Sequence, residues 1–295
     1  MAECEAPEAV ARTMAPPAWV VAGGRELKPG TPYGVMGILN LTPDSFYDGG
    51  RHDTGKAALA QAQALRDAGA DLLDIGAESS RPGARPLEPG EELERLVPVL
   101  CAVREHMPGL PVSVDTVHAA TADAALGMGA LVINDVSACR ADPELTDVLV
   151  ERKPGYVLMH SQGRPPDMQA APHYADVCRE VREFFGRELD RLVRAGLPED
   201  RIVLDPGIGF GKTLAHNLAL LAHAGEFLEF GRPLLVGLSM KSLFGELLGL
   251  PLSERGAATQ TASALLWERG VYWHRVHDVA GVTGALRLAA ALAGA

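Results

Sequence analysis

Eight short apolar segments recur along this chain, and most of them are followed by a stretch with helical periodicity. The segments cover residues 34–39, 71–75, 112–114, 131–133, 156–159, 201–204, 234–236 and 271–276. Strands that are apolar throughout and alternate with helices are typical of a parallel sheet covered by helices. Eight such units predict closure into a (β/α)8 TIM barrel, and an open doubly wound sheet is the structural alternative.

The segments between these strands have the apolar spacing of amphipathic helices. One such stripe consists of Val181, Phe184, Phe185, Leu189, Leu192 and Val193. Before the first strand, residues 19–33 contain Gly-Gly and Pro-Gly pairs, which predict a short N-terminal hairpin that closes the bottom of the barrel. We therefore predict a flexible N-terminal tail over residues 1–17 and a single barrel domain over residues 18–295.

The charge and the cysteine content exclude several classes of partner. A net charge of −11 argues against nucleic acid or an anionic membrane, because both need a basic surface. The four cysteines lack the spacing of a metal site, and we interpret them as reduced thiols. Residues 1–17 have no long apolar run, so we expect neither a secretory signal nor a membrane anchor. These features predict a cytoplasmic protein that acts on small molecules.

Polar residues follow the eight apolar segments, where the active sites of α/β barrels lie. They are Asn40, Asp74, Asp115, Asn134, His160, Gln162, Asp205, Ser239, Lys241, Arg275 and His277. Any barrel has polar strand ends, so each residue alone is as compatible with a structural role as with a functional one. Together, the acids, amides and cations suit a ligand with a donor-rich ring at one end and an anionic group at the other.

The spacing of these residues suggests how the work is divided. Side chains two apart on a strand point the same way, so Ser239 pairs with Lys241, and Arg275 with His277, around one anion. The carboxylates of Asp115 and Asp205 match the paired N–H groups of a guanidine-like heterocycle edge. The alternative is that these two aspartates only cap the turns that follow them.

A glycine-rich stretch at residues 207–213 resembles a phosphate-binding loop but fails on register, because proline stands at position 206. We interpret it as a tight loop over the barrel mouth that places Phe210 near a flat ligand. The loops at residues 40–50 and 78–84 are long and rich in turn residues. Such loops commonly bind substrate and close over it.

These motifs resemble those of the dihydropteroate synthases of the folate pathway, and the resemblance extends from about residue 34 to residue 279. The matching segments are 36–46 (MGILNLTPDSF), 74–83 (DIGAESSRPG), 113–116 (SVDT), 133–137 (INDVS), 158–160 (LMH), 205–212 (DPGIGFGK), 239–242 (SMKS) and 275–278 (RVHD). The resemblance implies transfer of a dihydropterin from its diphosphate to 4-aminobenzoate, with Mg²⁺ present. It also implies a homodimer and inhibition by sulfonamides.

The resemblance further assigns a role to each matching residue. The pterin would be bound by Asp115, Asn134, Met159, Asp205, Phe210 and Lys241. Diphosphate would be bound by Asn40, Arg275 and His277, with Asn40 also touching the metal. Aminobenzoate would be bound by Ser80, Arg81 and Ser239 once the first two loops close. The catalytic set would be Arg81, Lys241, Arg275 and His277, and Asp74 would have a supporting role.

The chain departs from the family pattern at three positions. Met240 stands where the family usually has arginine, which removes one cation from the edge of the site. Ser80 replaces a threonine and keeps the hydroxyl group, and Ser161 replaces a methionine. Two rival functions are a corrinoid methyltransferase that uses methyltetrahydrofolate and a pterin-binding barrel without catalysis. The first has little use for a diphosphate clamp, and the intact motifs argue against the second.

Diphosphate is a good leaving group, so the chemistry needs no protein nucleophile. The enzyme must mainly stabilise the departing charge, orient the amine and exclude water. We predict direct displacement with carbocation character at the pterin methylene.

Overall fold

The computed structural model describes residues 17–41, 51–78, 87–163, 168–169 and 171–294, with side chains in the first helix from residue 55 onward. Its ten strands are β1 (Trp19–Val21), β2 (Arg25–Leu27), β3 (Gly34–Asn40), β4 (Leu72–Gly76), β5 (Val112–Asp115), β6 (Val132–Asp135), β7 (Gly155–Met159), β8 (Ile202–Asp205), β9 (Leu235–Gly237) and β10 (Trp273–Val276). Most of the predicted tail, residues 1–16, lies outside the described residues.

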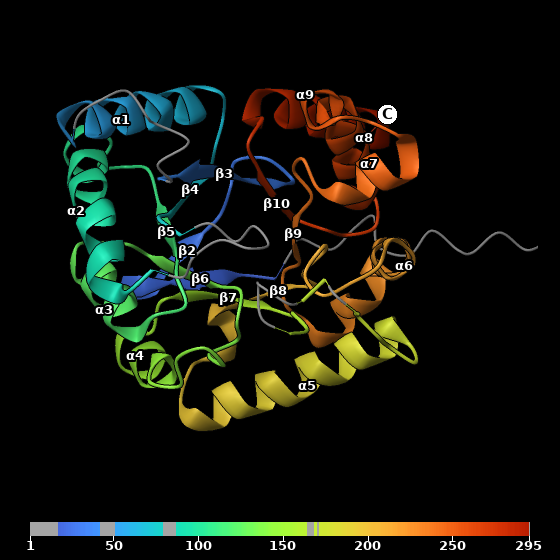
Figure 1. Ribbon diagram of the computed structural model, residues 1–295, viewed down its shortest axis with the longest axis horizontal. Coiled ribbons are helices and arrows are strands. Elements are labelled where there is room, and N and C mark those ends of the chain that lie inside the picture. The colour runs from blue at the N-terminus through green and yellow to red at the C-terminus, as the bar shows by residue number, and fades with distance from the viewer. Residues whose placement is uncertain (1–16, 42–50, 79–86, 164–167, 170, 295) are drawn as a thin grey trace, which may run out of the picture.

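The helices alternate with the strands and surround them (Figure 1). They are α1 (Arg51–Asp67), α2 (Pro89–His106), α3 (Ala119–Gly127), α4 (Leu145–Arg152), α5 (Val177–Ala195), α6 (Leu214–Ala222), α7 (Ser242–Leu248), α8 (Gly256–Trp267) and α9 (Val279–Ala293). Short 3-10 turns include Ala22–Gly24, Glu199–Arg201, Ala224–Phe230 and Leu252–Glu254. No helix within the described ranges has the length and apolar character needed to cross a membrane.

The eight strands β3 to β10 form one parallel sheet in the order β8-β7-β6-β5-β4-β3-β10-β9. A parallel bridge between Leu204 and Leu234 joins the two ends of this sheet, so the barrel closes. The predicted (β/α)8 barrel is therefore confirmed, and the open doubly wound sheet is excluded. Most strands end one or two residues later than the apolar segments do, because the residue after such a segment, for example Asn134 or Asp205, still pairs in the sheet.

The predicted hairpin is confirmed as the antiparallel pair β1–β2. Its side chains cover a buried layer inside the barrel, near the amino-terminal ends of the strands. We call this layer the lower layer. The lower layer consists of Met36, Leu72, Val132, Val157, Val203, Leu235 and Trp273. Trp19 of the hairpin packs edge to face against Trp273, with the ring centroids 5.2 Å apart. Its indole N–H donates to the carbonyl of Arg201 at 2.9 Å. The hairpin thus closes the amino-terminal end of the barrel.

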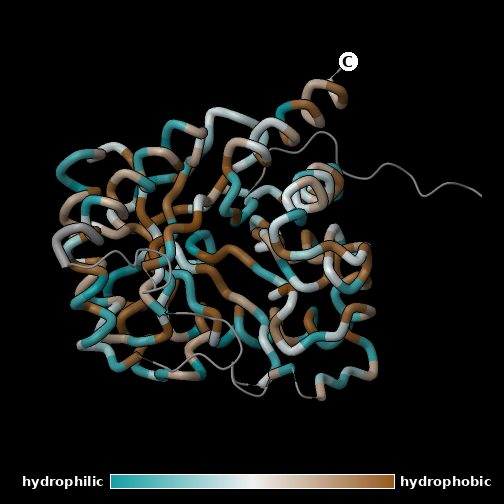
Figure 2. The backbone as a smooth tube through the Cα atoms, turned by 45° about the horizontal axis from the view of Figure 1, so that its top comes forward, coloured by the Kyte–Doolittle hydropathy of each residue, from teal (hydrophilic) through white to brown (hydrophobic). Residues whose placement is uncertain are grey.

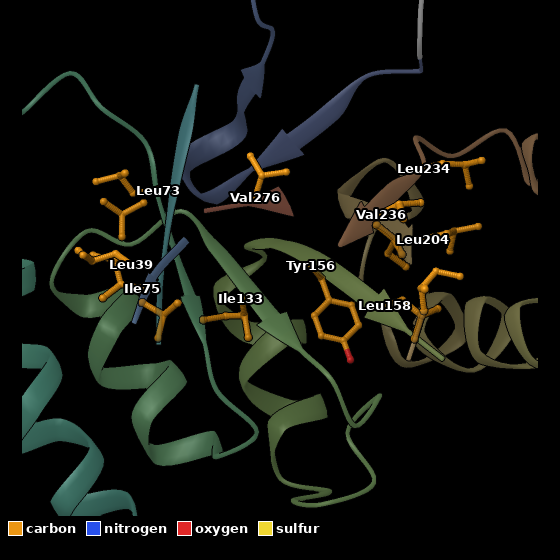
Figure 3. Close-up of a cluster of buried hydrophobic side chains, with 14 of the residues drawn as sticks. Leu39, Leu73, Ile75, Ile133, Tyr156, Leu158, Leu204, Leu234, Val236 and Val276 are labelled. Atoms are coloured by element: carbon orange, nitrogen blue, oxygen red, sulfur yellow. The ribbon is translucent and has the colours of Figure 1, made fainter. Parts of the chain in front are cut away.

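A second buried cluster fills the space between the outer faces of the strands and the helices (Figure 3). Strand residues such as Leu39, Ile75 and Leu204 belong to it, because side chains alternate between the two faces of a strand. Hydrophobic stretches accordingly run through the central strands of the backbone trace (Figure 2).

Helix α5 shows how a helix covers this cluster. It is capped by Asp176 at its start, and it ends at Gly196, which has φ of 116°. The expected stripe is buried except for Val193, which is 41% exposed because its position has turned away from the sheet.

Candidate active site at the carboxyl ends of the strands

Polar side chains inside the upper half of the barrel form a group that we call the upper ring. It consists of Asn40, Asp74, Asp115, Asn134, Asp205 and Arg275, each from a different strand. The register explains why they meet. Asp115 pairs directly with Asn134 across β5 and β6, and Asp205 is in register with Met159 of β7. The sheet therefore directs residues from distant parts of the sequence toward one axis.

Arg275 is the centre of the upper ring. Its Nε donates to Oδ2 of Asp74 at 2.6 Å, and its Nη2 donates to Oδ2 of Asp115 at 2.7 Å. Asn134 donates from Nδ2 to the same Asp74 oxygen at 2.9 Å. Asp74 is fully buried, so these two donors are what makes its charge tolerable there. Asp74 thus contacts both Arg275 and Asn134, and its supporting role in the reaction stays a prediction.

The two predicted acceptors of the upper ring have perturbed acidities. Burial raises the pKa of Asp115 to about 7, although the Arg275 guanidinium acts in the opposite direction. Burial also raises the pKa of Asp205 to about 6, against the backbone N–H of Gly207, which donates to Asp205 Oδ1 at 2.7 Å. Burial lowers the pKa of Arg275, but Asp74 and Asp115 outweigh this effect and keep it above its usual range. Both carboxylates are therefore poorly solvated, and a ligand with N–H donors could stabilise their charged forms.

Lys241 lies over the ring of Phe210, with Nζ 4.2 Å from the ring centroid. This contact is a cation–π interaction and fixes both side chains at one wall of the site. Burial, with the Arg275 charge as the second cause, lowers the pKa of Lys241 to about 8. Phe210 also packs with Met159 and Met168 in a small buried cluster. The predicted pterin residues Met159, Phe210 and Lys241 are thus near neighbours.

Ser239 contacts His277, whereas the spacing in the sequence pairs Ser239 with Lys241 and His277 with Arg275. The Ser239 hydroxyl lies 2.9 Å from Nδ1 of His277 and accepts the backbone N–H of His277 at 3.1 Å. Nε2 of His277 lies 3.4 Å from Nδ2 of Asn40. Asn40, Ser239 and His277 therefore stand together. Arg275 is engaged with the two carboxylates, so its closure with His277 on one anion stays a prediction.

The glycine-rich loop after β8 is tightly built against the end of β7. Gly207 has φ of +66°, and a Cβ there would lie 1.9 Å from the carbonyl oxygen of His160. Only glycine fits at this position, which agrees with the interpretation as a tight loop.

Lys212, the last residue of the same motif, is buried and donates into this loop. Sequence reasoning assigned no role to Lys212. The available signal was a lysine in an apolar, glycine-rich segment, where a charge is unexpected.

The sequence also singles out four other residues. Ser80 and Arg81 lie outside the described residues, so their roles stay predictions. Met240 has a left-handed backbone with φ of 59°, and its carbonyl accepts from Arg255 at 3.1 Å. Ser161 accepts from Arg140 at 2.8 Å and donates to the carbonyl of Val136 at 2.9 Å. The serine in place of methionine thus ties the end of β7 to the loop after β6.

The described residues contain no group of three or more His, Cys, Asp or Glu side chains that could bind a metal on their own. Mg²⁺ commonly keeps several waters and binds through few protein oxygens together with substrate phosphates. The Asn40 side chain directs its nitrogen at His277, which leaves its amide oxygen as a hard donor. This donor chemistry fits a Mg²⁺ ion that is held mainly by a phosphate ligand.

Comparison with known proteins identifies relatives over most of the chain. A family model described as pterin binding enzyme matches residues 36–277. Dihydropteroate synthase of Escherichia coli K12 is 41% identical over 254 residues, which cover 86% of this chain and 89% of that protein. The Synechocystis dihydropteroate synthase is 40% identical over 259 residues, covering 88% and 89%.

Solved structures agree with this match. Yersinia pestis dihydropteroate synthase with a sulfonamide drug complex has a TM-score of 0.86 and 41% identity, covering 93% of this chain and 98% of that one. The Xanthomonas albilineans enzyme with 4-aminobenzoic acid has a TM-score of 0.84 and 43% identity, covering 92% and 96%. The same enzyme in complex with 7,8-dihydropteroate has a TM-score of 0.82 and 40% identity, covering 93% and 98%.

Proposed function

Because the chain belongs to the pterin-binding enzymes and within them to the dihydropteroate synthases, we propose how its own residues divide the work of that reaction. The enzyme is a transferase of folate biosynthesis. It joins 6-hydroxymethyl-7,8-dihydropterin diphosphate to 4-aminobenzoate and releases diphosphate. The observation that carries the assignment of roles is the upper ring, in which Arg275 joins Asp74 and Asp115 at the carboxyl ends of the strands.

We propose that the pterin binds against Asp115, Asn134 and Asp205, with Met159, Phe210 and Lys241 around its ring. The Asp115 carboxylate already accepts a guanidinium N–H group from Arg275 at 2.7 Å. The amino-pyrimidinone edge of a pterin offers the same kind of donors, so it can replace this partner. The Nη2 group of Arg275 can then turn toward the diphosphate, while the half-buried Asp115 carboxylate keeps a hydrogen-bond donor.

Diphosphate would be held by Arg275, His277 and Asn40. Ser239 accepts from the backbone of His277 and so fixes the imidazole beside Asn40. Asn40 would also contact Mg²⁺, which, when bound to the diphosphate, neutralises part of its charge as the leaving group departs. Removing divalent ions with a chelator and then titrating Mg²⁺ back, with diphosphate release as the readout, tests this assignment.

The amine of 4-aminobenzoate attacks the pterin methylene directly. The hydroxyl of Ser239 is engaged with His277, so its role here is to orient the imidazole and the aminobenzoate rather than to act as a nucleophile. Ser80 and Arg81 would complete this end of the site. A covalent pterinyl enzyme trapped in the absence of aminobenzoate would contradict direct displacement.

The deciding experiment mixes the purified protein with the dihydropterin diphosphate and 4-aminobenzoate and measures diphosphate release. A synthase releases diphosphate only when both compounds are present, and a sulfonamide competes with aminobenzoate. A methyltransferase or a non-catalytic barrel releases none. Arg81→Ala should retain pterin affinity and lose turnover or aminobenzoate affinity. Equal loss of pterin affinity in Arg81→Ala and Asp205→Ala would contradict the role proposed for the loop.

We propose that residues 18–295 work as one domain, in the cytoplasm, as a homodimer. Exposed leucines from α7 through α9 support the dimer, since large apolar side chains in contact with water favour association. They are Leu247, Leu248, Leu252, Leu265, Leu288 and Leu292. Sedimentation of the native protein and of Leu288→Arg, at matched concentrations, tests it. A native protein that sediments as a monomer would refute the dimer.

A further inference from the structure

Lys212 is a buried cation whose described partners carry no negative charge. Only 3% of the residue is exposed. Nζ lies 2.9 Å from the carbonyl oxygen of Gly207, 3.1 Å from that of Phe210 and 3.2 Å from that of His160. It also lies 3.0 Å from Nδ1 of His160. Burying an ammonium group without a carboxylate costs free energy, so a purely structural hydrogen-bond donor would be better supplied by a neutral side chain.

Neutral side chains already hold the rest of this loop. Tyr174 donates its hydroxyl to the carbonyl of Gly211 at 3.0 Å, and Gln169 donates to the carbonyl of Gly209. The side-chain oxygen of Asn217 accepts the backbone N–H of Gly209 at 2.8 Å. The loop is therefore fixed on several sides without any charge. The charge of Lys212 calls for a separate explanation.

Lys212 is connected to Asp205 through a single residue. Its Nζ donates to the carbonyl oxygen of Gly207, and the N–H of Gly207 donates to Oδ1 of Asp205 at 2.7 Å. The charged and titratable groups that face Lys212 or Asp205 come from several elements. They are Arg140 after β6, His160 after β7, His216 on α6, Lys241 after β9 and Arg275 on β10.

The electrostatic effects agree with this geometry. Burial lowers the pKa of Lys212 to about 7, and the Asp205 carboxylate opposes that effect. Burial raises the pKa of Asp205, and Lys212 is one of the cations that lower it. Burial lowers the pKa of His160 to about 2, so the imidazole is neutral and can accept a hydrogen bond from Lys212.

We infer that Lys212 is a positioning residue for pterin recognition, whose positive charge keeps Asp205 ionised while its hydrogen bonds aim Gly207 and Phe210. This inference rests on the proposed function, in which Asp205 accepts the N–H groups of the pterin. Lys212 itself would not touch the substrate. Its effect would be carried by the Gly207 peptide and by its charge.

The test compares Lys212→Met with the native enzyme by measuring the dissociation constant of the dihydropterin diphosphate alone, from about pH 5 to about pH 8, together with thermal melting. An uncharged residue 212 raises the pKa of Asp205, so the pH at which affinity is lost should move upward. We expect Lys212→Met to bind about fivefold to tenfold more weakly near pH 6, and to show near pH 8 only the smaller loss caused by the missing hydrogen bonds to Gly207 and Phe210. The substrate's own phosphate titration affects both proteins alike.

Tyr174→Phe is the matched control, because it removes one hydrogen bond from the same loop and no charge. Its melting temperature should fall while its pH midpoint stays at the native value. If Lys212→Met fails to fold, Lys212→Gln takes its place, because it keeps an N–H donor without the charge.

Equal pH midpoints in the native and Lys212 variants, or failure of both variants to fold, would overturn the inference. Absence of pterin binding by the native enzyme would instead refute the proposed function.

Discussion

The lower layer and the upper ring differ by a single step along the same strands. Moving two residues toward the carboxyl end changes the inward side chain from hydrocarbon to polar or charged. The pairs are Leu72 and Asp74, Val132 and Asn134, Val203 and Asp205, and Trp273 and Arg275. The lower layer is covered by the hairpin and excludes water, whereas the upper ring holds acids with raised pKa values. The same backbone thus supports stability at one level and chemistry at the next.

This contrast explains why a barrel can hold a cluster of acids at all. The lower layer and the buried cluster between the strands and the helices stabilise the fold enough to offset the cost of placing several acids in the upper ring. Asp74, Asp115 and Asp205 would repel one another without Arg275. Substitutions in the lower layer should therefore mainly change stability, and substitutions in the upper ring should mainly change function.

The largest expected effect is on stability and follows from Trp273→Ala in the lower layer. Trp273 is 1% exposed and packs against Trp19, so its removal leaves a cavity under the hairpin. We expect a loss of about 3–5 kcal/mol in the free energy of unfolding, measured with urea. Pterin affinity should change little while the protein is folded. Trp267→Ala on α8, a partly exposed position, is the control and should cost less.

Arg275→Met tests the upper ring. Its removal takes away the proposed contact to the departing diphosphate, and kcat should fall about 10²- to 10³-fold in a diphosphate-release assay. It also leaves Asp74 with a single described donor, so stability should fall as well. Adding Asp74→Asn should restore part of the stability and none of the activity. Arg191→Met, which breaks a pair with Glu188 outside the barrel, should leave kcat near the native value.

The fold could be predicted from the sequence because hydrophobic periodicity is a local signal that the barrel obeys throughout. The predictions were wrong in detail at strand ends and at one helix position, where the local sequence pattern differs from what the tertiary structure requires. The apolar segments stop before polar residues such as Asn134 and Asp205, yet these residues still pair in the sheet and face the axis. Val193 fits the apolar spacing of its helix but is exposed, because its position has turned away from the sheet.

The site was predictable as a set of strand-end residues but not as a network. No spacing in the sequence indicates that Arg275 would bridge Asp74 and Asp115, because that choice depends on which strands become neighbours across the barrel. The sequence assigns no role to Lys212 for the same reason, since its contact with His160 joins residues 52 positions apart. The loops that carry Ser80 and Arg81 lie outside the described residues, and their roles rest on the resemblance.

Asp205→Asn should have the next largest effect, on pterin affinity. The amide keeps the shape of the carboxylate but can no longer accept two N–H groups, so we expect a loss of about 10- to 100-fold in affinity, or about 1.4–2.7 kcal/mol. Calorimetric titration with the dihydropterin diphosphate measures this loss. Asp135→Asn is the matched control. Asp135 is a buried strand-end carboxylate whose partners, including Tyr156, lie on the outer face of the strand. Its replacement should reduce stability and spare pterin affinity.

The smallest expected effect is on the pH dependence of folding, and it tests whether the upper ring costs stability. Folding raises the pKa of Asp205 to about 6, so between the unfolded and folded pKa values the folded state binds the extra proton. Stability contributed by this group is therefore present at low pH and is lost as the pH rises toward about 6. In Asp205→Asn this loss cannot occur.

Between about pH 5 and about pH 8 the variant should gain about 1 kcal/mol relative to the native protein in urea unfolding. If the free energies of unfolding of the two proteins change in parallel over that range, then ionised Asp205 does not reduce the stability of the fold. The upper ring would then differ from the lower layer in its function and not in a cost to stability.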